Sequence, residues 1–254
     1  MEKDGAPLPK NESPTTRTAN HRVLLGVFAH PDDETTSSAG SMCRYAREGV
    51  PVYIVTATRG EQGALGTNGV TYTREELPAV RERELREALA KYGAQPPIFL
   101  GYRDAEVKDA DYSELVAKIE AEMLRVKPTA VLTFGPHGIS KHPDHTAIHK
   151  ATIDAFHAYR KKTGTAASLN YIAIPGERAK QFGLDLDGPE TQPNITIDIT
   201  PDFKTKIWGL RNYRSQEDAQ MIAKMFEERE VTQESFHQAF PPLPPGVTKQ
   251  GFWE

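Results

Sequence analysis

VLLGVFAHPDDETTSSAG, residues 23–40, changes abruptly from seven mostly apolar residues to His30, Pro31 and three acidic residues. The apolar run predicts a buried strand, and the stretch after it predicts a helix at 35–48 that ends at Gly49. Pro31 favours an extended backbone at His30, so the chain carries this imidazole outward before it turns into the helix. The stretch therefore indicates a β-α unit with a candidate site at the carboxyl end of its strand.

The same alternation of short apolar runs and longer amphipathic stretches continues along the chain. Further strands are expected at 51–58, 97–100, 130–134, 169–174 and 195–199, and further helices at 78–92, 113–126, 144–160 and 202–230. Stacked β-α units of this kind build a mostly parallel sheet flanked by helices, so the predicted fold class is α/β. Residues 1–20 are polar and without periodicity, which predicts a flexible tail before a single domain at 21–254.

The composition excludes several classes of partner and cofactor. A net charge of −4 over 254 residues gives no long-range attraction for nucleic acid or for anionic membrane surfaces. The sequence has no apolar run of the roughly 18 residues that a membrane helix needs. The first residues also lack the apolar segment of a secretory signal, so we expect a cytoplasmic protein. The single cysteine, Cys43, excludes an internal disulfide framework and a cysteine-rich zinc module.

The first group of chemically active side chains follows the first predicted strand. In parallel α/β sheets ligands bind beyond the carboxyl ends of the strands, which is where His30 lies. His30 and Asp33 suit a divalent metal as ligands, and Asp32 beside them is then free to take a proton from water. The alternative is a helix N-terminus where acidic residues satisfy backbone N–H groups and the helix dipole. This motif alone does not decide between the two.

The second group follows the predicted strand at 130–134. The segment GPHGISKHPDHTAIHK contains four of the eight histidines: His137, His142, His145 and His149. One of them completes a set of three metal ligands with His30 and Asp33, because both segments begin at strand ends. The alternative is capping of a helix by Pro143 and Asp144, with His145 and His149 four residues apart on one helical face. Two His-Pro-Asp turns at two strand ends favour a shared metal site.

A glycine-rich stretch, RGEQGALGTNG at 59–69, follows the predicted strand at 51–58. It lacks the spacing of phosphate-binding loops, and the first strand leads into HPDDE rather than into the glycines of a dinucleotide site. The stretch is expected to be a surface loop or a loop that covers a ligand.

Several motifs together resemble one enzyme family. AHPDDE at 29–34 and HPDH at 142–145 carry the resemblance, with support from TRGEQG at 58–63, RERE at 81–84, FLGYRD at 99–104 and TFGPHG at 133–138. This set is similar to the zinc-dependent deacetylases typified by the N-acetylglucosaminyl-phosphatidylinositol de-N-acetylases (PIG-L) and the LmbE-like bacterial proteins. The resemblance implies a Rossmann-like fold with one zinc ion per chain.

The resemblance also implies a role for each matching residue. It places zinc on His30, Asp33 and His145, and it makes Asp32 the general base toward zinc-bound water. It makes His142 the residue that stabilises the oxyanion or protonates the leaving amine, with Asp144 orienting the imidazole. It further suggests that Arg59 and Glu61 bind substrate, and that Arg81, Glu84 and Asp104 form ion pairs of the scaffold.

The chain departs from the family pattern at two positions. Many relatives have a tyrosine where this chain has Ser140, two residues before the first histidine of HPDH, and there it helps to bind the oxyanion. Relatives also often have a histidine two residues before the late Ser-Gln pair, where this chain has Tyr213. Contributions from these two positions are not expected here.

These observations predict a metal-dependent hydrolase that removes an N-acyl group, most often acetyl, from an amino-sugar-type small molecule. Two alternatives remain open at this point: an amidase acting on a non-sugar N-acyl compound or thiol conjugate, and a metal-dependent carbohydrate-binding protein without turnover. The oligomeric state is also open, a homo-oligomer included.

Overall fold

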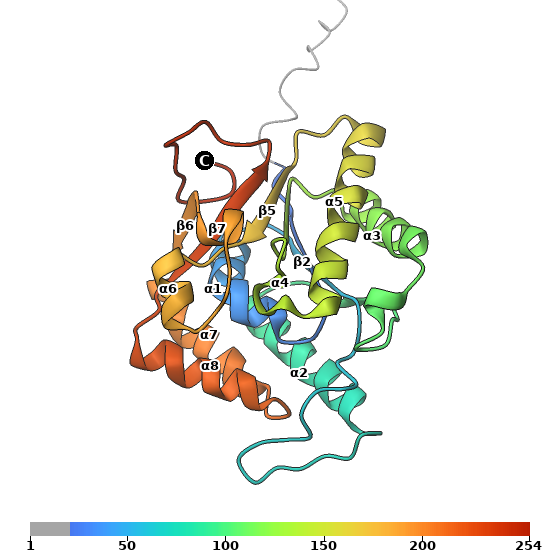
Figure 1. Cartoon of the computed structure of the whole chain (residues 1–254), viewed down its shortest axis with the longest axis vertical. Coiled ribbons are helices and arrows are strands. Elements are labelled where there is room, and N and C mark those ends of the chain that lie inside the picture. Colours follow the sequence, from blue (N-terminus) through green and yellow to red (C-terminus); the bar gives the residue numbers. More distant parts are fainter. Residues whose placement is uncertain (1–20) are drawn as a thin grey trace, which may run out of the picture.

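The computed structural model describes residues 21–254, and a seven-stranded sheet runs through its centre (Figure 1). The strands are β1 (Leu24–Phe28), β2 (Val52–Thr56), β3 (Ile98–Phe99), β4 (Ala130–Thr133), β5 (Ser168–Ile172), β6 (Ile195–Asp198) and β7 (Gln233–Phe240). Their order is β3-β2-β1-β4-β5-β7-β6. The first five are parallel, and β7 is antiparallel to both β5 and β6. The predicted α/β class with a mostly parallel sheet is confirmed.

Helices cover both faces of the sheet. In Figure 1, α3 (Tyr112–Val126) and α5 (Pro143–Thr163) pack together on one side, and α1 (Asp33–Arg47), α2 (Leu77–Tyr92) and α7 (Phe203–Asn212) pack together on the other. Because both faces are covered, every residue of β1 and of β4 is buried. This is why these two strands are continuous apolar runs in the sequence rather than alternating ones.

Shorter elements complete the fold around this core. They are α4 (Gly138–Lys141), α6 (Gly176–Gln181) and α8 (Glu217–Glu228), with three 3-10 turns, η1 (Val107–Asp109), η2 (Gly188–Thr191) and η3 (Thr200–Asp202). Within residues 21–254, no helix has the length and apolar character required to cross a membrane. The tail predicted at residues 1–20 lies outside the described residues.

The strand order reverses between β1 and β4, and this reversal positions the candidate site. β1 is hydrogen-bonded to β2 on one side and to β4 on the other, with Leu24 aligned to Val52 and to Ala130. The connections from β1 and β4 therefore leave in opposite directions, which opens a crevice at the carboxyl edge of the sheet. His30 follows β1 and the histidine-rich segment follows β4, so both groups lie at this crevice.

The structure differs from the sequence prediction in the last third of the chain. The single helix expected at 202–230 is two helices, α7 and α8, because the residues between them are anchored in the interior. Tyr213 donates a hydrogen bond to Glu34 at 2.7 Å, and the Ser215 amide donates one to Glu84 at 3.0 Å. Strand β7 was not predicted, since QESFHQAF contains few of the β-branched residues typical of strands.

Candidate metal centre and active site

Three side chains predicted as metal ligands meet at the crevice. His30 Nδ1 lies 3.1 Å from His145 Nε2, and Asp33 lies 3.7 Å from His30 Nδ1 through Oδ2 and 3.4 Å from His145 Nε2 through Oδ1. Zinc bonds of about 2.1 Å at tetrahedral angles place neighbouring ligand atoms roughly 3.4 Å apart. The two histidine nitrogens are therefore close to this spacing, and the two carboxylate oxygens of Asp33 each lie within 4 Å of one of them.

The second ring nitrogen of each histidine is held by the protein. His30 Nε2 contacts Asp104 Oδ1 at 3.0 Å and Asp144 Oδ2 at 3.4 Å. His145 Nδ1 bonds to the carbonyl oxygen of Gly138 at 2.9 Å, and its ring stacks on Phe134 with centroids 4.1 Å apart. Hydrogen bonds of this kind set the tautomer and the orientation of metal-binding histidines. Both rings are thus aimed at the position between them.

Charge around His30 favours a cation at this point. Burial disfavours a charged imidazole, but the hydrogen bonds to Asp104 and Asp144 outweigh it and raise the pKa of His30 to about 10. Burial likewise acts to raise the pKa of Asp104, yet its contacts with His30 lower that pKa overall. A buried pair of carboxylates that stabilises a protonated imidazole also favours a metal ion in place of the proton.

The HPDDE segment is braced by its own side chains. Asp33 Oδ2 accepts the backbone N–H of His30 at 2.7 Å, and Glu34 Oε2 accepts that of Asp32 at 3.0 Å. Asp32 has φ 108°, a left-handed conformation that costs a non-glycine residue about 1–3 kcal/mol. The three carboxylates thus differ in use: Asp33 faces the histidines, Glu34 supports the turn, and Asp32 remains beside the metal position.

Asp32 is held by one buried arginine. Arg81 Nη2 lies 2.7 Å from Asp32 Oδ2, and Arg81 also donates to the carbonyl oxygens of Pro31 and Gly60. Burial raises the pKa of Asp32 well above its ordinary value, and the positive charge of Arg81 opposes this rise. Burial and the ion pair with Arg81 thus act on the pKa of Asp32 in opposite directions, and burial has the larger effect.

The three residues expected to form scaffold ion pairs have different contacts. Arg81 pairs with the candidate base Asp32 rather than with the scaffold, and Asp104 contacts the candidate ligand His30. Glu84 is buried and accepts hydrogen bonds from the backbone N and the hydroxyl of Ser215, at 3.0 and 2.5 Å. Arg81 and Asp104 therefore do form ion pairs, but with candidate site residues rather than within the scaffold, whereas Glu84 is held by neutral donors.

His142 and Asp144 are close together but do not form the expected pair. His142 caps α5, its Nδ1 accepting the backbone N–H of Asp144 at 3.2 Å. The Asp144 carboxylate turns away to His30 and to the backbone N–H groups of Ala105 at 2.8 Å and Lys108 at 3.3 Å. Asp144 thus orients His30 instead of the His142 imidazole, because the first turn of α5 directs its side chain toward η1.

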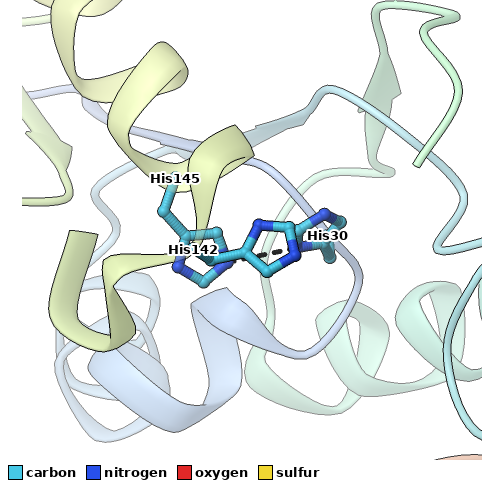
Figure 2. A group of neighbouring side chains, drawn as sticks. All are labelled: His30, His142 and His145. Carbon is cyan, nitrogen blue, oxygen red and sulfur yellow. Dashed lines mark hydrogen bonds between the residues drawn. The ribbon is translucent and has the colours of Figure 1, made fainter. Parts of the chain in front are cut away.

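His142 nevertheless lies at the site. Figure 2 shows its ring beside those of His30 and His145, which come from the end of β1 and the first turn of α5. The ring centroids of His142 lie 4.8 Å from His30 and 4.9 Å from His145. Burial lowers the pKa of His142, and the charges of the other two histidines lower it further. The neutral form of His142 is therefore favoured before a metal binds.

The two predicted substrate-binding residues face different neighbours. Arg59 Nε lies 2.7 Å from Glu82 on α2, and its guanidinium sits 4.6 Å from the centroid of Phe99. Glu61 Oε2 accepts the backbone N–H of Asp104 at 3.0 Å, so Glu61 supports a neighbour of His30. The structure thus brings Glu61, and not Arg59, next to the group of candidate ligands.

The glycine-rich loop packs on buried side chains near the site. A Cβ at Gly63 would lie 2.5 Å from both Arg81 and Gln216, so a larger residue here would displace the ends of these two side chains. The loop is also tied to the connection between α7 and α8, since the Gly66 amide donates to the Ser215 carbonyl at 3.1 Å. Arg81 therefore contacts both this loop, through Gly60, and Asp32.

One supporting residue, Glu190 on η2, has no signal in the sequence. Its fully buried carboxylate accepts the backbone N–H groups of His137 at 2.7 Å and Ile139 at 3.1 Å, and it contacts His137 Nδ1 at 2.6 Å. Gly138, whose carbonyl oxygen holds the His145 ring, lies between those two residues. Glu190 is 45 or more residues away in sequence from the motifs it supports, and a lone glutamate in a loop gives no hint of this contact.

Fold and site together describe an α/β protein with a group of histidines and aspartates that could hold a metal ion at the switch point of its sheet. The family model described as "PIG-L: GlcNAc-PI de-N-acetylase" matches residues 25–156, just over half of the chain. The chain belongs to this family, as its motifs predicted. The match ends inside α5, so it covers the elements that carry all the candidate ligands.

Similar proteins carry names of two reaction types. A "Probable N-acetyl-alpha-D-glucosaminyl L-malate deacetylase 2" of Bacillus anthracis is 38% identical over 78% of this chain and 82% of its own length. The conserved protein TT1542 of Thermus thermophilus is 25% identical with a TM-score of 0.62, covering 87% of this chain and 96% of its own. The 4-carboxy-2-hydroxymuconate hydratase of Pseudomonas putida has a TM-score of 0.65 at 19% identity, covering 89% of this chain and 100% of its own. The fold is therefore shared by different chemistries.

Proposed function

We propose that this protein is a metal-dependent N-deacetylase that hydrolyses the acetamide of an amino-sugar-type small molecule. The observation that carries the proposal is the group formed by His30, Asp33 and His145. The carboxylate of Asp32, which is paired with Arg81 and is not one of the proposed metal ligands, lies beside this group. The deacetylase name of the Bacillus relative supports the same reaction, and the shared fold alone does not, since a hydratase also has it.

The metal is proposed to be zinc, one ion per chain, held by His30 Nδ1, His145 Nε2 and the Asp33 carboxylate. The spacing of these atoms and the mixed nitrogen and oxygen ligands fit zinc. A zinc ion supplies Lewis acidity here, which polarises an amide carbonyl and makes water more acidic.

The side chains of this protein account for the proton transfers. Asp32 accepts a proton from the attacking water, and Arg81 at 2.7 Å keeps the carboxylate in place for this step. The leaving amine must then receive a proton, and Asp32 passes on the one it has taken from water. His142 faces the same space as His30 and His145 and is proposed to stabilise the oxyanion by donating a hydrogen bond from Nε2, while Asp144 and Asp104 hold the His30 ring.

The test removes the charge of the Asp32 side chain and keeps its shape. Asp32→Asn should retain zinc, measured by elemental analysis, and should release amine from N-acetylglucosamine conjugates roughly 10²–10⁴-fold more slowly than wild type, the range for loss of a general base. Asp109→Asn, at an exposed position on η1, is the matched control and should match wild type. Unchanged amine release by Asp32→Asn would show that another group takes the proton.

A further inference from the structure

A cavity of about 440 Å³ opens directly from the candidate metal centre. Asp32, Asp33 and His145 line its near end. Within residues 21–254 the rest of the lining comes from the first turn of α1, the segment from β4 to α4, the end of β5, α6 and the segment after it, α7, α8, and the start of β7. The cavity therefore extends from the candidate metal centre toward the part of the chain that follows residue 170, all of which lies beyond the family match.

The walls of this cavity are mainly apolar. Aromatic and aliphatic side chains from the end of β5, from α6 and the loop after it, and from α8 supply most of the lining, with five neutral polar residues among them: Thr36, Ser37, Ser140, Gln233 and Ser235. Phe182, Leu184 and Ile222 in this lining are partly exposed, and Phe182 and Ile222 also pack against the hydrophobic cluster of α7 and α8. A concave apolar surface that continues into a catalytic centre is typical of a ligand subsite.

The charges beyond the metal centre cancel. Lys206 and Glu234 are each 2% exposed and form an ion pair at 2.6 Å, so neither charge is available to a ligand. The remaining two charged side chains of the lining are one cation, Arg178, and one anion, Asp218. The cavity thus has no net charge away from the metal centre and does not select a strongly charged group.

The size of the cavity far exceeds what an acetyl group fills. The methyl of an acetyl group occupies roughly the volume of one water molecule, about 30 Å³. Burying further hydrocarbon in the remaining space is favourable by about 0.8 kcal/mol for each methylene group. Where the amide and the sugar leave space along the apolar walls, an apolar extension of the substrate is therefore stabilised.

We infer that the substrate of this enzyme carries an apolar group, a hydrocarbon chain or an aromatic ring, which binds in this cavity while the amide lies at the metal centre. The inference rests on the proposed function for the position of the amide. The apolar group is either the N-acyl chain or the substituent at the sugar's anomeric position, and the two sources have the same chemistry.

The test uses two series of substrates with the zinc-loaded wild-type protein. One series lengthens the acyl chain from N-acetyl to N-butanoyl, N-hexanoyl and N-octanoyl glucosamine, and the other lengthens an alkyl glycoside of N-acetylglucosamine from methyl to octyl. In the series that uses the cavity, kcat/KM should rise up to about fourfold per methylene, the fold-change that corresponds to 0.8 kcal/mol. Flat or falling values in both series, with N-acetylglucosamine still hydrolysed, would overturn the inference and leave the proposed function standing.

Two leucines of one loop provide a matched pair of variants. Leu184 lines the cavity, while Leu186 is similarly half-buried in the same loop but is not part of the lining. Leu184→Gln should lower kcat/KM for the longest productive substrate roughly tenfold, near the lower limit of what burying a leucine contributes, and should leave the shortest substrate unaffected. Leu186→Gln should match wild type. Equal effects of both variants would count against the cavity.

A binding measurement separates this inference from the proposed function. Octyl glucoside has no amide, so calorimetric titration below its micelle concentration detects the apolar subsite without any reaction. Binding to wild type that is weakened in Leu184→Gln supports the subsite even if no amide is cleaved. If octyl glucoside and N-octanoyl glucosamine both fail to bind to wild type, the inference is wrong.

Discussion

Glu190 should control the affinity of the metal centre although it contacts no candidate ligand. Its carboxylate accepts the N–H groups of His137 and Ile139, and the residue between them, Gly138, holds the His145 ring through its carbonyl oxygen. Ile139 has φ 62°, a left-handed conformation that the chain adopts only if neighbouring contacts hold it. Removing the carboxylate therefore frees the segment that aims His145.

The magnitude follows from these contacts. Glu190→Ala leaves two partly buried N–H groups without an acceptor, and since a fully buried group would cost about 1–3 kcal/mol, the free energy of unfolding should fall by up to about 6 kcal/mol. Loss of the group that orients a metal-binding histidine typically lowers metal affinity 10–100-fold. Glu190→Gln keeps one acceptor oxygen and the same shape, so it should fold even where Glu190→Ala does not, with a smaller loss of zinc affinity.

Zinc affinity is measured by competition with a chromophoric chelator, and stability by denaturant unfolding of the metal-free protein. Glu177→Ala, at an exposed position on α6, is the control and should change neither quantity. If Glu190→Gln or Glu190→Ala is less stable but binds zinc as tightly as wild type, the reasoning is refuted. Glu190 would then stabilise the turn at Gly138 without affecting the orientation of the His145 ring.

Three further predictions concern the charges and hydrogen bonds around the site. The pKa of His30 is raised to about 10 without metal, so zinc must displace a proton from His30 below that pH. The affinity for zinc should therefore rise between pH 6 and pH 9. Calorimetry in two buffers should detect about one proton released for each zinc ion bound at pH 7. Arg81→Met removes the charge that opposes the raised pKa of Asp32, so the acidic limb of the kcat/KM profile should move to higher pH; an unmoved limb would assign it to another group. Tyr213→Phe removes the 2.7 Å hydrogen bond to buried Glu34 and should lower the free energy of unfolding by about 1.5–3 kcal/mol in urea titrations, whereas a loss under 0.5 kcal/mol would mean that Glu34 finds another donor.

Much of the fold and part of the site could be predicted from local sequence patterns. Strand β1 and helix α1 lie within a few residues of their predicted bounds, because a continuous apolar run and the residues at helix ends act locally. The bracing of HPDDE is also local, with Asp33 bonded to His30 and Glu34 to Asp32. The expected meeting of His30 and His145, which are 115 residues apart, followed from one topological rule about parallel strand ends.

The partners of these residues could not be predicted from the same patterns. A carboxylate such as Asp104 or Asp144 gives the same local signal whether it caps a helix, pairs with a surface lysine or holds a histidine. Only packing decides, since Asp144 reaches His30 across 114 residues and Tyr213 reaches Glu34 across 179. The pairing of Asp144 with His30 rather than with His142 depends on the direction of one helical turn.

The sequence by itself determined the α/β class, the strand ends at which chemistry gathers, and the identity of the histidines and aspartates there, because each rests on short-range periodicity or on spacing within one segment. The tertiary structure alone decided which carboxylate orients which imidazole, which arginine holds Asp32, and where an apolar cavity meets the metal centre. That cavity joins residues from Asp32 to Ser235, and its walls belong to elements without a shared motif. Enclosed space arises only from the packing of distant segments, so no local pattern records it.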